Sequence, residues 1–324
     1  MPTAEPAHNV PLIDFSPLLQ DEVEGKRKVA SEVYEALSQV GFMYVANAGM
    51  PKPLRDRTFQ EMANFFARPS DDKEALAWTT PEANRGYVGP GRQALDPKRP
   101  GDLKEAFDTG WELDPSEGER AQVQVNRWPL DASEFRETVL TFYRYALQAA
   151  HRVLSTMEAA LALQANTFVG THQHHNHTLR LLHYPPISEH SPEPRQIRAG
   201  AHTDFGSVTL LFQDGLGGLE VRERQNRWIS APAFPETILV NTGDCIERWT
   251  NDVFRSTAHR VAMPEGNEAT QSRYSIAFFC SPDPETEIRC LPTCLDDGNE
   301  EKYSPILARQ HLINRLDQTY GKVG

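Results

Sequence analysis

The residues with the clearest capacity for chemistry are the triplet His202-Thr203-Asp204 and a later histidine, His259. Residues two apart on an extended segment point to the same side, so His202 and Asp204 can offer an imidazole nitrogen and a carboxylate oxygen to one ion. A second imidazole from His259, on a distant strand, would complete one face of an octahedron. The pattern therefore predicts a metal site with three protein ligands and three open positions.

Two metals suit such a site. Two histidines and one carboxylate with open positions are the ligands of non-haem Fe(II) oxygenases, which bind a co-substrate and O₂ at the open positions. Catalytic zinc sites use the same three ligand types. An H-x-D triplet alone arises often by chance, and a surface histidine beside a turn or capping aspartate is the alternative. The metal prediction therefore depends on the motifs that accompany the triplet.

A second motif, Arg273-Tyr274-Ser275, opens the apolar strand RYSIAFF. Strand alternation places Arg273 and Ser275 on one face together with Phe279. A guanidinium on the inward face of a barrel strand is costly unless an anion meets it. It can hold a carboxylate through two parallel hydrogen bonds, and a serine hydroxyl can add a third. The motif predicts a carboxylate site; an arginine that reaches solvent or pairs with a nearby glutamate is the alternative.

A third strand, predicted over Thr178–Tyr184, agrees with this interpretation. Alternation places Arg180, Leu182 and Tyr184 on one face. The phenol of Tyr184 could donate a hydrogen bond to the carboxylate that Arg273 holds. A buried core tyrosine with a satisfied hydroxyl is the alternative.

The elements that must position these residues change character along the chain. Helical spacing of apolar residues predicts helices over 26–40, 54–67, 133–163 and 305–320. Many Pro and Gly residues predict a long loop over 79–102. Short strands are expected over 10–15 and 42–45, and then, once the period becomes two, over 178–184, 207–213, 218–222, 237–241, 259–263 and 273–280. Short strands separated by turn signals indicate a jelly roll with supporting N-terminal and C-terminal helices, in a single domain over 1–324.

The composition of the 324 residues limits the class of partner. Lys and Arg number 33 against 45 Asp and Glu, a net charge of −12, which argues against nucleic acid as the main partner. No apolar run approaches the roughly 18 residues of a membrane span, and the N-terminus lacks the pattern of a signal peptide. Four cysteines are too few for a disulfide scaffold. We expect a cytoplasmic protein whose partner is a small molecule, with no nucleic acid and no membrane.

The order of these motifs resembles the isopenicillin N synthase-like branch of the Fe(II)/2-oxoglutarate-dependent dioxygenases. In the N-terminal part the similar blocks are VPLIDFSPLL, GFMYVANAG, FFARPSDDK and RGYVGPG. In the later part they are LRLLHYPP, AHTDFGSVTLLFQD, GLGGLEV, ILVNTGDCIERWTND, STAHRV and RYSIAFF. The resemblance implies a double-stranded β-helix, a jelly roll, with the family's N-terminal region over 1–125 and its catalytic core over 178–285.

The resemblance also implies an activity and a site. The implied enzyme hydroxylates or desaturates a small organic molecule with Fe(II), 2-oxoglutarate and O₂, and releases succinate and CO₂. The implied iron ligands are His202, Asp204 and His259. The residues implied to hold the distal carboxylate of 2-oxoglutarate are Arg273, Ser275 and Tyr184. No catalytic residue beyond the metal ligands is expected.

Further expectations concern the pocket around the metal. Many plant members carry an asparagine two residues before the tyrosine, where this chain has Leu182, although Arg180 shares that face. Phe205 and Phe279 are candidates for contact with a flat or apolar substrate, and simple core packing is the alternative for each. The loop over 87–96 and the C-terminal helix could act as lids.

A histidine cluster and a cysteine pair are not expected to take part in catalysis. Four histidines precede the strand at 178, and we expect a solvent-exposed loop rather than a second metal site. Their positions are His172, His174, His175 and His177. Cys290 and Cys294 have no matching second pair, so free thiols are expected rather than half a zinc site.

Three functions compete for this sequence. The leading one is a 2-oxoglutarate-dependent hydroxylase or desaturase. An oxidase of the same fold that works without 2-oxoglutarate, for example in an oxidative cyclisation, is the second. A non-catalytic binding protein is the third, and an intact metal triad weighs against it.

Overall fold

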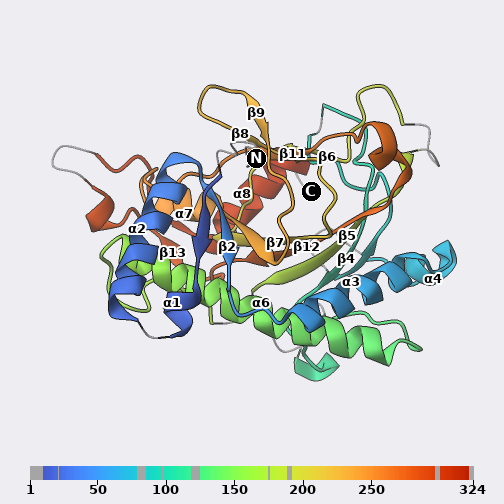
Figure 1. The fold of residues 1–324 in the computed structure, drawn as a ribbon, viewed down its shortest axis with the longest axis horizontal. Coiled ribbons are helices and arrows are strands. Elements are labelled where there is room, and N and C mark those ends of the chain that lie inside the picture. The colour runs from blue at the N-terminus through green and yellow to red at the C-terminus, as the bar shows by residue number, and fades with distance from the viewer. Residues whose placement is uncertain are drawn as a thin grey trace, which may run out of the picture.

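The architecture consists of two facing β-sheets with helices packed against one of them (Figure 1). The computed structural model describes residues 10–20, 22–78, 85–96, 98–117, 125–173, 176–187, 192–295 and 300–320. The large sheet contains, in spatial order, β1 (Leu12–Asp14), β2 (Phe42–Ala46), β10 (Thr237–Thr242), β7 (Val208–Gln213), β12 (Arg273–Cys280), β5 (Thr178–Tyr184), β4 (Glu105–Thr109) and β3 (Gly86–Val88). The small sheet contains β6 (Ala199–His202), β11 (His259–Val261), β8 (Leu219–Arg222) and β9 (Trp228–Ser230). The predicted jelly roll is confirmed.

Helices α2 (Val23–Gln39), α3 (Lys52–Phe66) and α6 (Ser133–Ala160) cover the face of the large sheet that is turned away from the small one. Figure 1 shows α6 and α3 along the lower side of the sheet and the small sheet above it. The other main α-helices are α1 (Ser16–Leu19), α4 (Ser70–Glu74), α7 (Asp244–Trp249) and α8 (Ala308–Tyr320). A two-stranded ribbon of β13 (Glu287–Ile288) and β14 (Ile306–Leu307) precedes α8. Among the described residues, no helix combines the length and the apolar character that crossing a membrane requires.

Alternation along β12 divides the interior into two cores. Ile276 and Phe278 belong to the core between the sheet and the helices, where the Phe278 ring meets Tyr143 of α6 edge-on at 5.2 Å. Ala277 belongs to the core between the two sheets, together with Tyr184 of β5. The period-two prediction for this strand is therefore confirmed, and the face that carries Arg273 is the face toward the small sheet.

One predicted loop is partly a strand. Within 79–102, β3 pairs antiparallel with β4 and extends the large sheet. Tyr87 of β3 is buried, and its hydroxyl donates a hydrogen bond to the Glu105 carboxylate of β4 at 2.5 Å. The Pro and Gly residues mark the turns around this strand, and the pairing that creates it depends on β4. Residues 79–84 and 97 of the predicted loop lie outside the described residues.

The prediction of an exposed histidine loop is wrong for the two histidines that the structure describes. His172 and His177 are 1% and 0% exposed. The Nδ1 of His172 donates to the Phe168 carbonyl at 2.7 Å and its Nε2 accepts from the Ser207 hydroxyl at 2.8 Å. Burial lowers the pKa of His172 to about 4, so the ring is neutral. His174 and His175 lie outside the described residues.

Candidate metal centre and co-substrate pocket

The register of the small sheet brings the two predicted histidine ligands together. His202 at the end of β6 is the cross-strand partner of His259 at the start of β11. Their ring centroids lie 4.3 Å apart. The Nε2 of each histidine lies 3.8 Å from Oδ1 of Asp204. One ligand atom from each of the three side chains lies within 4.8 Å of the others, so the group could hold a single ion.

Each imidazole is oriented by a carbonyl close to it in sequence. Nδ1 of His202 lies 2.8 Å from the Gly200 carbonyl, and Nδ1 of His259 lies 3.2 Å from the Thr257 carbonyl. A carbonyl can only accept a hydrogen bond, so Nδ1 carries the proton in both rings. The lone pair is then on Nε2, the nitrogen that faces Asp204, and such outer hydrogen bonds are typical of metal-binding histidines.

The aspartate is oriented in the same way. Its Oδ2 accepts hydrogen bonds from the Thr209 hydroxyl at 2.6 Å and the Asn241 amide at 2.7 Å, which leaves Oδ1 for the histidines. Burial alone would raise the pKa of Asp204, but His259, His202 and these two hydrogen bonds hold it below its ordinary value. Burial, and then the neighbouring His259, lower the pKa of His202. A buried carboxylate with two imidazoles on one side is a donor set that fits Fe(II).

Arg273 is buried at the start of β12, 1% exposed, without a carboxylate partner among the described residues. Its guanidinium donates to the Gly217 carbonyl at 2.9 Å, the Gln213 side chain at 2.9 Å and the Ser275 hydroxyl at 3.3 Å. All three acceptors are neutral. A buried guanidinium without a carboxylate in direct contact is expensive, so this pocket is suited to receive an anion.

Tyr184 of β5 lies opposite Arg273 in the strand register. The Arg273 guanidinium sits 4.8 Å from the centroid of its ring, and burial raises the pKa of Tyr184. A second guanidinium, of Arg198, lies 5.9 Å from the same ring. Arg198 is 2% exposed, and its Nε is buried without a hydrogen-bond partner. Sequence reasoning missed Arg198, which precedes β6 outside any predicted strand.

The rest of the predicted inward face of β5 is charged as well as apolar. Arg180 makes two hydrogen bonds to Asp108 of β4, at 2.7 and 2.8 Å. Leu182 is buried and lies opposite Ser275 in the register. Sequence reasoning also missed a buried pair beside this face, in which Lys104 donates to Asp102 at 2.5 Å. Asp102 in turn accepts from the Gly200 amide at 2.9 Å, which ties this pair to the strand that carries the first histidine.

The two predicted substrate contacts are both half-buried aromatic residues. Phe205 directly follows Asp204, and the guanidinium of Arg315 lies 5.1 Å from its ring centroid. Phe279 of β12 has the Arg180 guanidinium 5.8 Å from its ring centroid. Their roles toward a substrate stay predictions.

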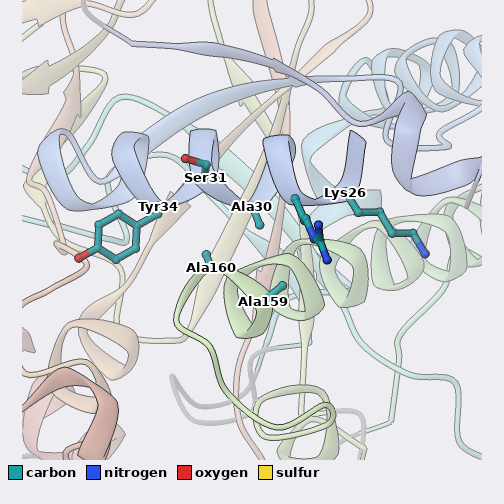
Figure 2. Close-up of a pocket in the computed structure, with 7 residues that line it drawn as sticks. Lys26, Ala30, Ser31, Tyr34, Ala159 and Ala160 are labelled. Atoms are coloured by element: carbon teal, nitrogen blue, oxygen red, sulfur yellow. The ribbon is translucent and has the colours of Figure 1, made fainter. Parts of the chain in front are cut away.

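A surface pocket elsewhere on the molecule has a different character. Figure 2 shows it between α2 and the C-terminal end of α6, with a volume of about 470 Å³. Its lining includes Lys26, Tyr34 and Ala159, and none of the predicted site residues. The chemistry predicted from the sequence therefore lies between the sheets and not in this pocket.

Comparisons with known proteins agree with the geometry. The profile of the "non-haem dioxygenase in morphine synthesis N-terminal" family matches residues 10–131, and that of the 2OG-Fe(II) oxygenase superfamily matches residues 175–282. The chain is 32% identical to the 2-oxoglutarate-Fe(II) type oxidoreductase hxnY of Emericella nidulans, covering 96% of this chain and 90% of that one. It is 34% identical to the proline hydroxylase buaE of Petromyces alliaceus, covering 95% and 98%.

Solved structures give the same result. The chain superposes on a full-length Neurospora crassa protein in complex with alpha-KG and thymine with a TM-score of 0.86 and 35% identity, covering 96% of this chain and 97% of that one. These findings confirm the leading prediction of the sequence. The chain belongs to the 2OG-Fe(II) oxygenase superfamily and is an oxygenase that uses Fe(II) and 2-oxoglutarate to oxidise a small molecule.

Proposed function

We propose that His202, Asp204 and His259 bind the Fe(II) of this oxygenase. The observation that carries the proposal is the mutual orientation of the three side chains, in which both Nε2 atoms face one carboxylate oxygen at 3.8 Å. The outer hydrogen bonds to Gly200 and Thr257 support it, because they fix the tautomer that a metal requires. When bound, the iron supplies the redox chemistry that activates O₂.

Arg273, Ser275 and Tyr184 bind the distal carboxylate of 2-oxoglutarate in this proposal. The guanidinium offers hydrogen bonds and a positive charge that no carboxylate of the described residues contacts directly, while the Ser275 hydroxyl lies 3.3 Å from it. Leu182 lies opposite Ser275 and is buried, so it contributes apolar surface that keeps water from this end of the pocket. The low-dielectric surroundings strengthen the attraction between guanidinium and carboxylate. These residues would hold the co-substrate in one orientation relative to the metal.

We further propose a small substrate with a flat ring, bound against Phe205 and Phe279. Both rings are half-buried, one directly after a proposed iron ligand and one on the strand of Arg273. The Neurospora crassa relative was crystallised with thymine and with 5-formyluracil, both of which are flat rings. The test is succinate release measured across a panel of heterocycles and saturated amino acids. Coupled turnover with saturated substrates alone would contradict the flat-ring proposal.

We also propose that the protein forms a single domain and is located in the cytoplasm. The N-terminal helices share one hydrophobic core with β5, β7 and β12, which supports a single domain over 1–324 with a core over 178–285. All four cysteines are buried free thiols, as expected in the reducing cytoplasm.

The experiment that tests the iron ligands is an alanine substitution of His202 or Asp204. Either variant should lose 2-oxoglutarate turnover and bind Co(II), a stable substitute for Fe(II), at least about a hundredfold more weakly, because a metal site loses one of three protein ligands. Isothermal titration with Co(II) measures this directly. The matched control is His183→Ala, a histidine on the opposite face of β5 that should retain Co(II) binding. Unchanged Co(II) affinity in His202→Ala would contradict the assignment.

A further inference from the structure

The C-terminal helix α8 reaches the turn that carries two of the proposed iron ligands (Figure 1, the red helix near the centre). Arg315 of α8 donates from Nη2 to the Thr203 hydroxyl at 3.0 Å. Thr203 stands between His202 and Asp204 in the sequence, so the contact lies on the backbone segment that joins the two ligands. A residue more than a hundred positions away in the chain therefore touches the ligand turn directly.

Asp244, the first residue of α7, completes the contact. Its carboxylate forms an ion pair with Nε of Arg315 at 2.8 Å and accepts a hydrogen bond from the Thr203 hydroxyl at 3.3 Å. The Ser256 hydroxyl fixes the other carboxylate oxygen at 2.6 Å. The backbone amide of Asp244 also donates to the carbonyl of Asp204 at 2.8 Å. Arg315 and Asp244 thus bracket the Thr203 hydroxyl, and Asp244 holds the backbone of the adjacent ligand.

Arg315 also supports the residue after the ligand. Its guanidinium lies 5.1 Å from the centroid of the Phe205 ring, within the range of a cation–π contact. The side chain of Arg315 is 31% exposed and that of Asp244 is 13% exposed, so solvent only partly screens the pair. One guanidinium therefore touches Thr203 and Phe205, the two residues that flank Asp204.

We propose that Arg315 is a positioning residue of the active site, which fixes the turn 202–205 by contacts on both sides of Asp204. The proposal rests on the proposed function, in which this turn supplies two iron ligands and one substrate contact. It makes α8 part of the metal site although α8 supplies no ligand. Outer contacts of this kind commonly change metal affinity by a factor of roughly ten to a hundred.

A structural role for α8 as a whole is the competing explanation, and Arg309 provides the control. Arg309 lies on the same helix and forms an ion pair with Glu285, in which both side chains are more than half exposed. Removing its charge changes the helix by a similar amount without touching the ligand turn. Arg315→Met and Arg309→Met are therefore a matched pair.

The test is titration of the full-length protein with Co(II) in the presence of 2-oxoglutarate, followed by calorimetry. We expect Arg315→Met to raise the Kd for Co(II) about tenfold and Arg309→Met to leave it within about twofold. Equal Kd values in wild type and Arg315→Met would overturn the proposal, as would equal losses in the two variants. A wild-type protein that binds no Co(II) would instead overturn the proposed function, so the two failures can be told apart.

A second variant keeps the test decisive if Arg315→Met lowers the melting temperature strongly. Thr203→Val removes the hydroxyl between Arg315 and Asp244 and leaves their ion pair in place. It should raise the Kd for Co(II) several-fold, and the double variant with Arg315→Met should bind no worse than Arg315→Met alone. Effects that simply multiply would show that Arg315 does not act through the Thr203 hydroxyl, and would overturn the proposal of contacts on both sides of Asp204.

Discussion

Two buried cations, one on each face of the large sheet, differ in their partners. On the helix side, Lys73 of α4 forms an ion pair with Glu105 of β4 at 2.8 Å, and both side chains are at most 10% exposed. On the side toward the small sheet, Arg273 is equally buried and meets only neutral acceptors. The first cation is already compensated by the protein, whereas the second is left for a ligand to compensate.

The helix-side pair belongs to a closed network. Glu105 also accepts from the Tyr87 hydroxyl at 2.5 Å and bonds Nδ1 of His183 at 2.7 Å. Burial would raise the pKa of Glu105, but hydrogen bonds from His183, Lys73 and Tyr87 lower it, so the carboxylate is ionised. Four elements, α4, β3, β4 and β5, are joined at this one carboxylate. A buried charge can therefore stabilise the fold or bind a ligand, and its partners distinguish the two roles.

The largest effect is expected on the unfolding free energy when a substitution breaks the helix-side network. Glu105→Gln leaves the Lys73 ammonium buried without its counter-charge, and breaking a buried pair in this way costs roughly 4 kcal/mol of unfolding free energy. Urea unfolding followed by circular dichroism measures the loss. The control is Glu220→Gln, which breaks a half-buried pair with Arg260 on the small sheet and should cost less than about 1 kcal/mol. Similar losses of unfolding free energy in both variants would show that the buried pair stabilises the fold no more than the half-buried pair does.

The next effect appears in ligand binding instead of stability. Arg273→Leu removes a charge that has no ion-pair partner among the described residues, so the unfolding free energy should stay within about 1 kcal/mol of wild type. The Kd of the Co(II)-loaded protein for 2-oxoglutarate should rise by about a hundredfold, equivalent to roughly 3 kcal/mol for a lost charged contact. Calorimetric titration with 2-oxoglutarate measures it. A stable variant with unchanged 2-oxoglutarate affinity would show that the anion site lies elsewhere.

The difference between these two regions also explains which parts could be predicted from the sequence. Alternation within one strand predicts that Arg273 and Ser275 share a face, and spacing within one segment predicts that His202 and Asp204 converge; the structure has both arrangements. Such patterns are local, because the geometry of a single strand fixes them. The jelly roll followed from the number of short strands and from the resemblance to a known family.

Contacts between residues that are far apart in the sequence could not be predicted in this way. Lys73 and Glu105 meet because α4 packs beside β3 and β4, and Arg315 reaches Thr203 because α8 returns to the small sheet. No local period specifies such pairings. The error at His172 has the same origin: a histidine-rich segment suggests an exposed loop, but the ring is buried because the Phe168 carbonyl and Ser207 hydroxyl satisfy both nitrogens.

The smallest expected effect concerns Arg198, which resembles Arg273 in its burial and in its lack of a carboxylate partner among the described residues. Its Nη2 donates only weakly, to the Pro185 and Gln271 carbonyls at 3.3 Å, while the guanidinium lies 5.9 Å from the Tyr184 ring. We therefore assign Arg198, like Arg273, to the co-substrate pocket, where it orients Tyr184. Arg198→Met should weaken 2-oxoglutarate binding about fivefold, equivalent to roughly 1 kcal/mol.

The control for Arg198 is a cation–π pair of similar length on the surface. Arg222 is exposed and lies 6.0 Å from the Trp228 ring, outside the co-substrate pocket. Arg222→Met should leave 2-oxoglutarate affinity unchanged. In a Tyr184→Phe background Arg198→Met should have little further effect, because the hydroxyl that Arg198 orients is already absent. The contrary outcome is that Arg198→Met lowers the unfolding free energy by several kcal/mol and leaves the affinity for 2-oxoglutarate unaltered. Arg198 would then stabilise the fold, as Lys73 does. The lack of a carboxylate partner would no longer identify a buried cation that binds a ligand.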